Sequence, residues 1–187
     1  MTTTHTYLAY ALFLTVPCLA AAGPLITPDP FSGSVAGYPG SSVGWGFTVQ
    51  SDPSDWTAFV ASFPLSESNP SVGFYTDFIG AQGGPVNFVL PPGAPDWIES
   101  FNPVAQTGLG SYTIDPAALP GAVDSGTILI LYQLYSADPN TCGSCSAGTG
   151  SLDVPFQVTV TAAPEPGTWF LPAIGLALLA ARRRRTV

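Results

Sequence analysis

Residues able to carry out catalytic chemistry are few in this sequence. The only histidine is His5, lysine is absent, and all four arginines are consecutive, Arg182 to Arg185. Between residues 23 and 163 we therefore expect no Ser–His or Cys–His pair, no lysine base and no arginine clamp. Carboxylates remain, because all of the chain's 12 Asp and Glu except Glu165 lie in that stretch. Two facing acids could serve a glycoside hydrolase, but carboxylates scattered over predicted loops favour a domain without catalytic residues.

Cys142 and Cys145 have the C-x-x-C spacing of redox motifs. They lie in a Gly/Ser-rich stretch with no predicted helix whose N-terminus would lower the pKa of a thiol. We therefore predict a structural disulfide between them, formed after export, that closes a short ring and contributes about 2 kcal/mol.

Metal sites are also poorly supported. Asp138, Asn140 and Gly143 occupy positions one, three and six of an EF-hand-like pattern, but Thr149 stands where that pattern needs a bidentate Glu. The acidic stretch from Asp52 to Asp55 indicates only a solvated turn. We expect no cofactor and no metal site, and calcium binding by so acidic a domain is left open.

Three tryptophans of the central region could stack on a sugar ring. Trp45 lies on the apolar face of an alternating stretch and is expected in the core, whereas Trp56 and Trp97 each follow an Asp near a turn. If Trp56 and Trp97 are exposed on one face, the domain is a carbohydrate-binding module. This is the alternative to a purely sorted surface protein.

Short apolar stretches separated by Gly, Pro, Ser and Asp predict strands throughout the central region. The stretch from Thr127 to Tyr135 is apolar on both faces, which is typical of a central strand. Phe156, Val158 and Val160 alternate with polar residues and are expected to point inward. The predicted strands are Val43–Val49, Trp56–Phe63, Val72–Ile79, Val86–Leu90, Leu109–Ile114, Thr127–Tyr135 and Phe156–Thr161.

This pattern predicts an all-β fold, a single β-sandwich of about seven or eight strands. The many prolines rule out long helices, and only Asp115 to Pro120 could form a single helical turn, with Asp115 as its cap. That turn precedes the apolar strand at Thr127, an order that resembles the E–F crossover of immunoglobulin-like domains. A jelly roll would give nearly the same series of strands.

The N-terminus has the features of a secretory signal peptide, an apolar run from Tyr7 followed by Ala20 and Ala22 in an A-x-A arrangement. Cleavage after Ala22 is expected, and Pro17 before Cys18 does not suit a lipidation site. The chain therefore divides into a signal peptide (1–22), a β-sandwich domain (23–163) and a C-terminal segment (164–187).

The C-terminal segment joins three features in a fixed order. Pro164-Glu165-Pro166 is followed by an apolar run from Trp169 to Ala181 and then by the arginine cluster. The apolar run is shorter than the roughly 20 residues that cross a bilayer as a helix, so it predicts a marginal transmembrane helix. The cluster is expected to act as a membrane stop on the cytoplasmic side. It consists of Arg182, Arg183, Arg184 and Arg185.

These three features together resemble the PEP-CTERM sorting signal of exosortase substrates in Gram-negative bacteria. The resemblance covers only the tail, with Pro164, Glu165 and Pro166 as the sorting motif. It implies a protein held transiently at the inner membrane, cleaved by exosortase and delivered to the cell surface or to an exopolysaccharide matrix, as in biofilms. The acidic central region argues against nucleic acid as a partner, since phosphate binding rests on Lys and Arg.

Overall fold

The computed structural model describes residues 23–80 and 89–163 of the 187-residue chain. The predicted signal peptide and the C-terminal segment lie outside the described residues, as do residues 86–88 of the predicted strand Val86–Leu90. Within the described part the fold is all-β with no helix, as expected.

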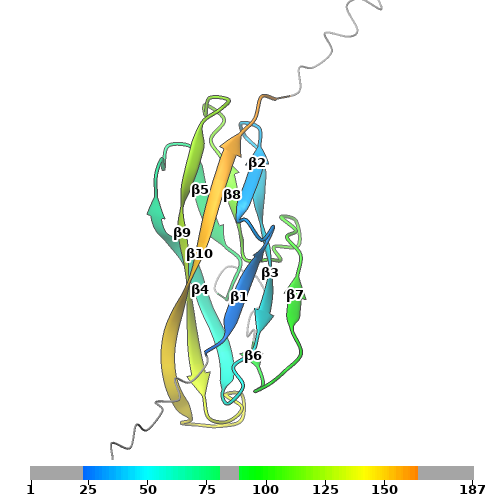
Figure 1. Ribbon diagram of the computed structural model, residues 1–187, viewed down its shortest axis with the longest axis vertical. Coiled ribbons are helices and arrows are strands. Elements are labelled where there is room, and N and C mark those ends of the chain that lie inside the picture. Colours follow the sequence, from blue (N-terminus) through cyan, green and yellow to red (C-terminus); the bar gives the residue numbers. More distant parts are fainter. Residues whose placement is uncertain (1–22, 81–88, 164–187) are drawn as a thin grey trace, which may run out of the picture.

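Ten strands form two sheets, each of five strands, packed face to face (Figure 1). One sheet has the order β1-β3-β8-β5, and β7 also pairs with β3; the other has the order β2-β10-β9-β4-β6. The strands are β1 (Leu25–Asp29), β2 (Ser34–Gly37), β3 (Ser42–Gln50), β4 (Trp56–Glu67), β5 (Gly73–Asp77), β6 (Val89–Leu90), β7 (Trp97–Glu99), β8 (Gly110–Ile114), β9 (Val123–Tyr135) and β10 (Ser146–Val160).

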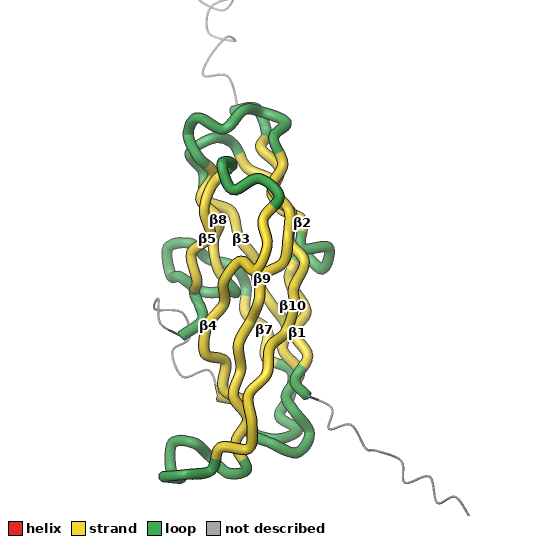
Figure 2. Tube along the Cα trace, turned by 90° about the vertical axis from the view of Figure 1, so that its left-hand side faces the viewer, coloured by secondary structure: helices red, strands yellow, loops and turns green. Residues whose placement is uncertain are grey.

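The second sheet is built on its long antiparallel strands. Figure 2 shows β4, β9 and β10 running side by side, and β9 is the middle strand of the five, as its apolar sequence predicted. Register shifts in the β4–β9 pairing, at Phe59/Ala61 and Pro64/Ser66, mark two bulges in β4. β2 adds to β10 in the parallel direction, against Gln157–Val160 only. Most of the length of β10 therefore has a neighbour on one side alone.

The predicted sandwich is confirmed, but it has more strands than the seven or eight expected. The strands that sequence reasoning missed are β1, β2 and β7. Their signals are weak because β1 contains Pro28, β2 is four residues long and β7 is three. The long strands were also underestimated, since β4 continues to Glu67 through Pro64, and β10 begins at Ser146 in the Gly/Ser-rich stretch. The immunoglobulin-like topology stays a prediction.

An aromatic cluster fills the space between the sheets. Trp45 is fully buried, as expected, and its indole N–H donates to the carbonyl oxygen of Gly33 at 2.8 Å. Its ring packs edge-on against Phe156, with ring centroids 5.8 Å apart, and the ring of Tyr112 also contacts Phe156, with centroids 6.3 Å apart. Phe156, Val158 and Val160 all point inward, as their alternation predicted. The indole bond and the ring contacts join the two layers.

The segment after β8 forms a turn and no helix. Asp115 caps it as predicted, because its side chain accepts a hydrogen bond from the backbone N–H of Ala117 at 2.7 Å. Its carbonyl oxygen accepts a second bond from the N–H of Ala118 at 2.9 Å. Pro120 follows at once, and a proline cannot continue a helix beyond this turn.

Gly126 in β9 provides a test of the close packing between β9 and β4. A Cβ at Gly126 would lie 1.9 Å from the carbonyl oxygen of Ser66, a backbone atom that cannot move aside cheaply. Gly126→Ala should therefore lower the free energy of unfolding by about 1–3 kcal/mol, measured by chemical denaturation. The matched control is Gly148→Ala in β10, where a Cβ would meet nothing within 4 Å. Equal stability of the two variants would contradict this register.

Candidate functional site

Asp124 is a buried carboxylate, and the part of the chain that the structure describes contains no basic side chain to pair with it. It is fully buried, and its Oδ2 accepts a hydrogen bond from the hydroxyl of Tyr112 at 2.8 Å. Its Oδ1 accepts bonds from the backbone N–H of Asn69 at 2.8 Å and the hydroxyl of Ser68 at 3.3 Å. Neutral hydrogen-bond donors therefore solvate this charge. Their bonds connect β9 to β8 and to the loop after β4.

Asp77 is partly buried and forms the second carboxylate network, which joins β4 to β5. Its oxygens accept hydrogen bonds from the N–H of Ser62 at 3.0 Å, the hydroxyl of Ser62 at 2.5 Å and the N–H of Ile79 at 2.7 Å. The hydroxyl of Tyr75 lies 2.7 Å from that of Ser62 and donates to the carbonyl oxygen of Leu109 at 3.0 Å. Ser62 is only 3% exposed. Its hydroxyl is thus a structural donor that no substrate can reach.

Burial changes the proton affinities of the acids in these networks. Desolvation raises the pKa of Asp77 despite its three hydrogen bonds. The pKa of Glu67 is also raised, first by partial desolvation and then by the negative charge of Asp124. Burial likewise raises the pKa values of the Tyr75 and Tyr112 hydroxyls, so both stay protonated donors at neutral pH.

The turn at Asp52 forms, but it is not the solvated turn that the sequence indicated. Asp52 is 1% exposed, and its Oδ1 accepts bonds from the N–H groups of Ser54 at 2.7 Å and Asp55 at 2.8 Å. Its carbonyl oxygen accepts a bond from Gly93, which brings a loop distant in sequence against the turn. In the part of the chain that the structure describes, Asp52 Oδ2 and Thr57 Oγ1 are buried without a hydrogen-bond partner.

The bond from Tyr112 to Asp124 can be tested by removing one hydroxyl. Tyr112→Phe leaves a buried carboxylate oxygen without its donor, which should cost about 1–3 kcal/mol of unfolding free energy. Tyr38→Phe is the matched control because Tyr38 is 49% exposed. Denaturant melts of both variants check this. A Tyr112→Phe protein as stable as the control would mean that the Asp124 network adds nothing to the fold.

Because the pKa values of Glu67 and Asp77 are raised, the stability of the folded protein should depend on pH. The folded protein holds these protons to a higher pH than the unfolded chain does, so their stabilising contribution is complete below the ordinary carboxyl pKa of about 4. It is lost as the pH rises through the folded values. The melting temperature should therefore rise as the pH falls from 7 toward about 4, and relief of repulsion among the carboxylates adds to this.

Glu67→Gln should flatten that rise, because it removes one of the two groups. Glu99→Gln, at the other glutamate of the described region, is the matched control and lies in β7 of the first sheet, whereas Asp124 lies in β9 of the second. Thermal melts at several pH values and constant ionic strength make the comparison. A wild-type melting temperature that fell steadily on acidification would contradict the raised pKa values of Glu67 and Asp77.

Trp56 and Trp97 do not form the shared platform that a carbohydrate module built on them would need. Trp97 is 37% exposed and lies on the edge strand β7 of the first sheet, where its indole N–H donates to Glu99 at 3.1 Å. Trp56 is half-buried and begins β4 in the second sheet, opposite Tyr135 of β9. The rings therefore belong to different layers, and sequence proximity to turns could not reveal this.

The outer face of the second sheet carries the most developed surface feature. Ile128, Ile130 and Val154 point into the core, so the alternate residues of β4, β9 and β10 point outward. Cross-strand partners line up on this face in rows. From the end with the β9–β10 hairpin, the rows are Trp56–Tyr135–Ser146, Ala58–Gln133–Thr149, Ala61–Leu131–Ser151 and Phe63–Leu129–Asp153.

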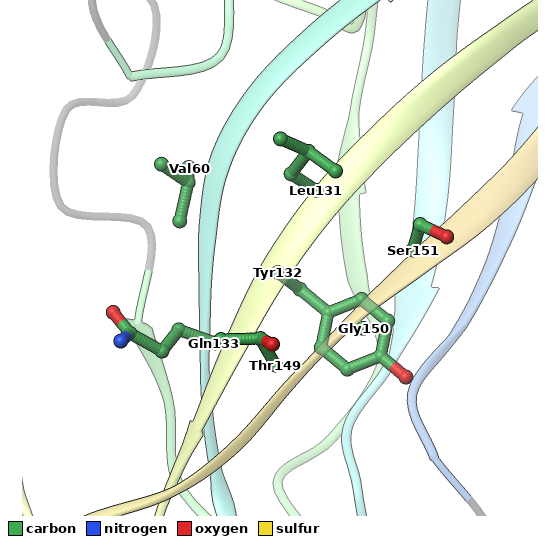
Figure 3. Close-up of a pocket in the computed structure, with 7 residues that line it drawn as sticks. All are labelled: Val60, Leu131, Tyr132, Gln133, Thr149, Gly150 and Ser151. Carbon is green, nitrogen blue, oxygen red and sulfur yellow. The ribbon is translucent and has the colours of Figure 1, made fainter.

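The second and third of these rows border a groove of about 460 Å³ (Figure 3). Val60, Leu131, Tyr132, Gln133, Thr149, Gly150 and Ser151 line it. In Figure 3, Val60 and Leu131 lie together on one side and Gln133 and Thr149 on the other. Sequence reasoning missed these residues, although apolar residues on both faces of β9 signalled them. Only Ile128 and Ile130 of that stretch are fully buried, whereas Leu129 and Leu131 are half-exposed on the outer face.

The β9–β10 hairpin contains the predicted disulfide, between Cys142 and Cys145. Asp138 begins this turn, and its Oδ1 accepts bonds from the backbone and side-chain N–H groups of Asn140 at 2.9 and 3.1 Å. Within residues 23–80 and 89–163, no group of three or more His, Cys, Asp or Glu is placed to hold a metal ion. Calcium binding stays a prediction.

The two ends of the described chain lie at opposite ends of the sandwich (Figure 1). The last strand, β10, ends at Val160, and the N–H of Thr161 still bonds the carbonyl oxygen of Gly37 at 2.7 Å. Among the residues that the structure does describe, none forms a helix able to span a membrane.

The residues predicted for signal cleavage, sorting and membrane stop all lie outside the described residues. Their roles therefore stay predictions from the sequence, and the structure neither supports nor corrects them. They are Ala20, Ala22, Pro164, Glu165, Pro166, Arg182, Arg183, Arg184 and Arg185.

Comparison with known families concerns the tail. Residues 162–185 match the PEP-CTERM protein-sorting motif, and this confirms the resemblance found from the Pro-Glu-Pro motif and the arginine cluster. No curated protein matches the chain. The motif indicates an exported protein that exosortase processes and that is sorted to the cell surface.

Proposed function

We propose that this chain is a non-catalytic surface or matrix protein, and that exosortase releases it from a transient hold at the inner membrane. After release, its sandwich domain associates with exopolysaccharide. The observation that carries the proposal is the order of the parts: β10 ends at Val160, and the sorting motif begins at residue 162. The β-sandwich is thus the part that sorting would deliver.

The positions of the acids support a non-catalytic role. The negative charge of Asp124 contributes to the raised pKa of Glu67, an effect that also occurs between the two acids of a hydrolase. Asp124, however, is fully buried, and both of its oxygens already accept hydrogen bonds. A glycoside hydrolase needs both carboxyl groups open to the scissile bond. Asp124 is therefore suited to linking strands, through its bonds to Tyr112, Ser68 and Asn69.

The charge of the domain restricts its partners. Between residues 23 and 163 every charged side chain is a carboxylate, because the arginines and the histidine lie elsewhere. Anionic polysaccharides and nucleic acids are repelled unless divalent cations bridge the two surfaces. An uncharged polysaccharide meets no such barrier. It is the partner that the electrostatics favour.

The transient hold at the membrane follows from the tail sequence. Arg182 to Arg185 resist translocation and so stay in the cytoplasm, while the short apolar run from Trp169 to Ala181 holds the chain only marginally. Pro164 and Pro166 lack backbone N–H donors, which disfavours extension of the sheet from β10 into the motif. The motif is then free for a protease on the outer side.

Two tail variants should fail in different ways in a host that has exosortase. Replacing Pro164, Glu165 and Pro166 with Ala should leave an uncut precursor in the membrane fraction, because the protease motif is gone while the stop remains. Replacing Arg182 to Arg185 with Ser should weaken retention, because the charge that stops translocation is removed. Cell fractionation and intact mass measurement distinguish these outcomes.

The control is the same pair of variants, beside the wild-type chain, in a host without exosortase, where the wild-type chain should stay uncut. The proposal fails if wild-type protein from the exosortase host still carries residues 169–187 as its main form. An uncleaved tail anchor would then be the better description.

A further inference from the structure

We propose that the outer face of the sheet β2-β10-β9-β4-β6 binds an uncharged polysaccharide in the groove lined by Gln133, Thr149 and Ser151. The inference rests on the proposed function, since it names the class of polymer and its site. The groove spans β4, β9 and β10, the three longest strands, and so lies on a rigid surface. Its residues come from these paired strands, with Val60 at a bulge of β4, and none comes from a loop.

The groove is the neutral part of an acidic domain. None of its lining residues carries a charge, although the domain around it has only negative charges. The nearest charge on the same face is Asp153, one row beyond Ser151. An anionic chain would be repelled there, whereas a neutral one would not. Charge therefore selects against uronate, phosphate or sulfate polymers.

Polar groups in the groove are free to bind hydroxyls. In the described part of the chain, the hydroxyls of Thr149 and Ser151 make no hydrogen bond to protein. Gln133 is already oriented, because its Oε1 accepts a bond from the Tyr135 hydroxyl at 2.5 Å. Its Nε2 is then left as a donor that points away from Tyr135. Two hydroxyls and one amide in adjacent rows match the repeated hydroxyls of a glycan.

Apolar and aromatic side chains flank these polar groups. Val60 is 49% exposed, and Leu131 is half-exposed beside it in the groove, so both can contact the C–H face of a sugar ring. Trp56 and Tyr135 pair across β4 and β9 in the next row of outward residues. Neighbouring rows are about 7 Å apart along a strand, so the aromatic pair can contact the same bound chain.

A second copy of this chain is the competing occupant of the face. Two copies facing each other would bring together two like-charged domains and would bury the unpaired Thr149 and Ser151 hydroxyls. Burying each of these polar groups without a hydrogen bond is unfavourable. The polar composition of the groove therefore favours a glycan.

Binding can be measured by affinity gel electrophoresis with soluble polymers cast in the gel. The probes are hydroxyethyl cellulose and dextran, which are neutral, and alginate, which is anionic. The protein is the processed form from an exosortase host, or the full chain in mild detergent if it is not processed. We expect retardation by at least one neutral polymer and none by alginate in the presence of chelator.

Gln133→Ala should weaken binding to the retarding polymer about tenfold, because the groove loses its amide donor and the group that the Tyr135 hydroxyl holds in place. Gln157→Ala is the matched control, since Gln157 is exposed on the same face of β10 but lies beyond the groove, where β10 pairs with β2. The control should bind like the wild-type protein. Equal binding by both variants would overturn the groove as the site.

Failure of this inference differs from failure of the proposed function. If the chain is cut and exported but no neutral polymer retards it, the groove proposal is wrong and the sorting proposal stands. If the chain is never cut, the sorting proposal fails whatever the full chain binds. Sedimentation of wild type and Gln133→Ala tests the competing occupant, and a wild-type dimer that this variant dissociates would assign the face to self-association.

Discussion

The central constraint on this domain is that it folds without a single positive charge between residues 23 and 163. No ion pair can compensate a carboxylate there, and an isolated buried charge is costly. The structure meets this constraint with neutral donors: tyrosine and serine hydroxyls and backbone N–H groups surround Asp124 and Asp77. These hydrogen bonds connect strands of both sheets. The two acids, whose desolvation is unfavourable, therefore also link the sheets to each other.

The same constraint shapes the surface. Exposed carboxylates disfavour the binding of anionic polymers, and the groove on β4, β9 and β10 is the neutral region where we propose that a partner binds. Apolar side chains at that face, such as Val60 and Leu131, would be a solubility problem without the polar side chains of Gln133, Thr149 and Ser151 beside them. The charge distribution of the domain and the side chains that line the groove therefore both favour the groove as the proposed binding site.

Regular alternation made much of the fold predictable from sequence. Trp45 and Phe156 were assigned to the core correctly, and β9 was assigned to the middle of its sheet. The short strands β1, β2 and β7 were missed because they depend on pairing with β3 and β10, which no local pattern records. The groove was missed for a related reason. It joins residues of three strands whose register is fixed by the two bulges of β4, and bulges leave no reliable mark in a sequence.

The groove and the sorting segment are connected by β10, so their separation along this strand can be estimated. The chain leaves the sandwich after β10, and Ser151 in the groove lies nine residues before Val160 on that same strand. At about 3.4 Å per residue, the groove is held about 30 Å from the point where the sorting segment begins. If the tail holds the chain at the membrane, as we propose, the length of β10 would keep the groove away from the lipid surface. A polymer on the outer side of that membrane could then be bound before release as well as after it, and cleavage would need no rearrangement of the domain.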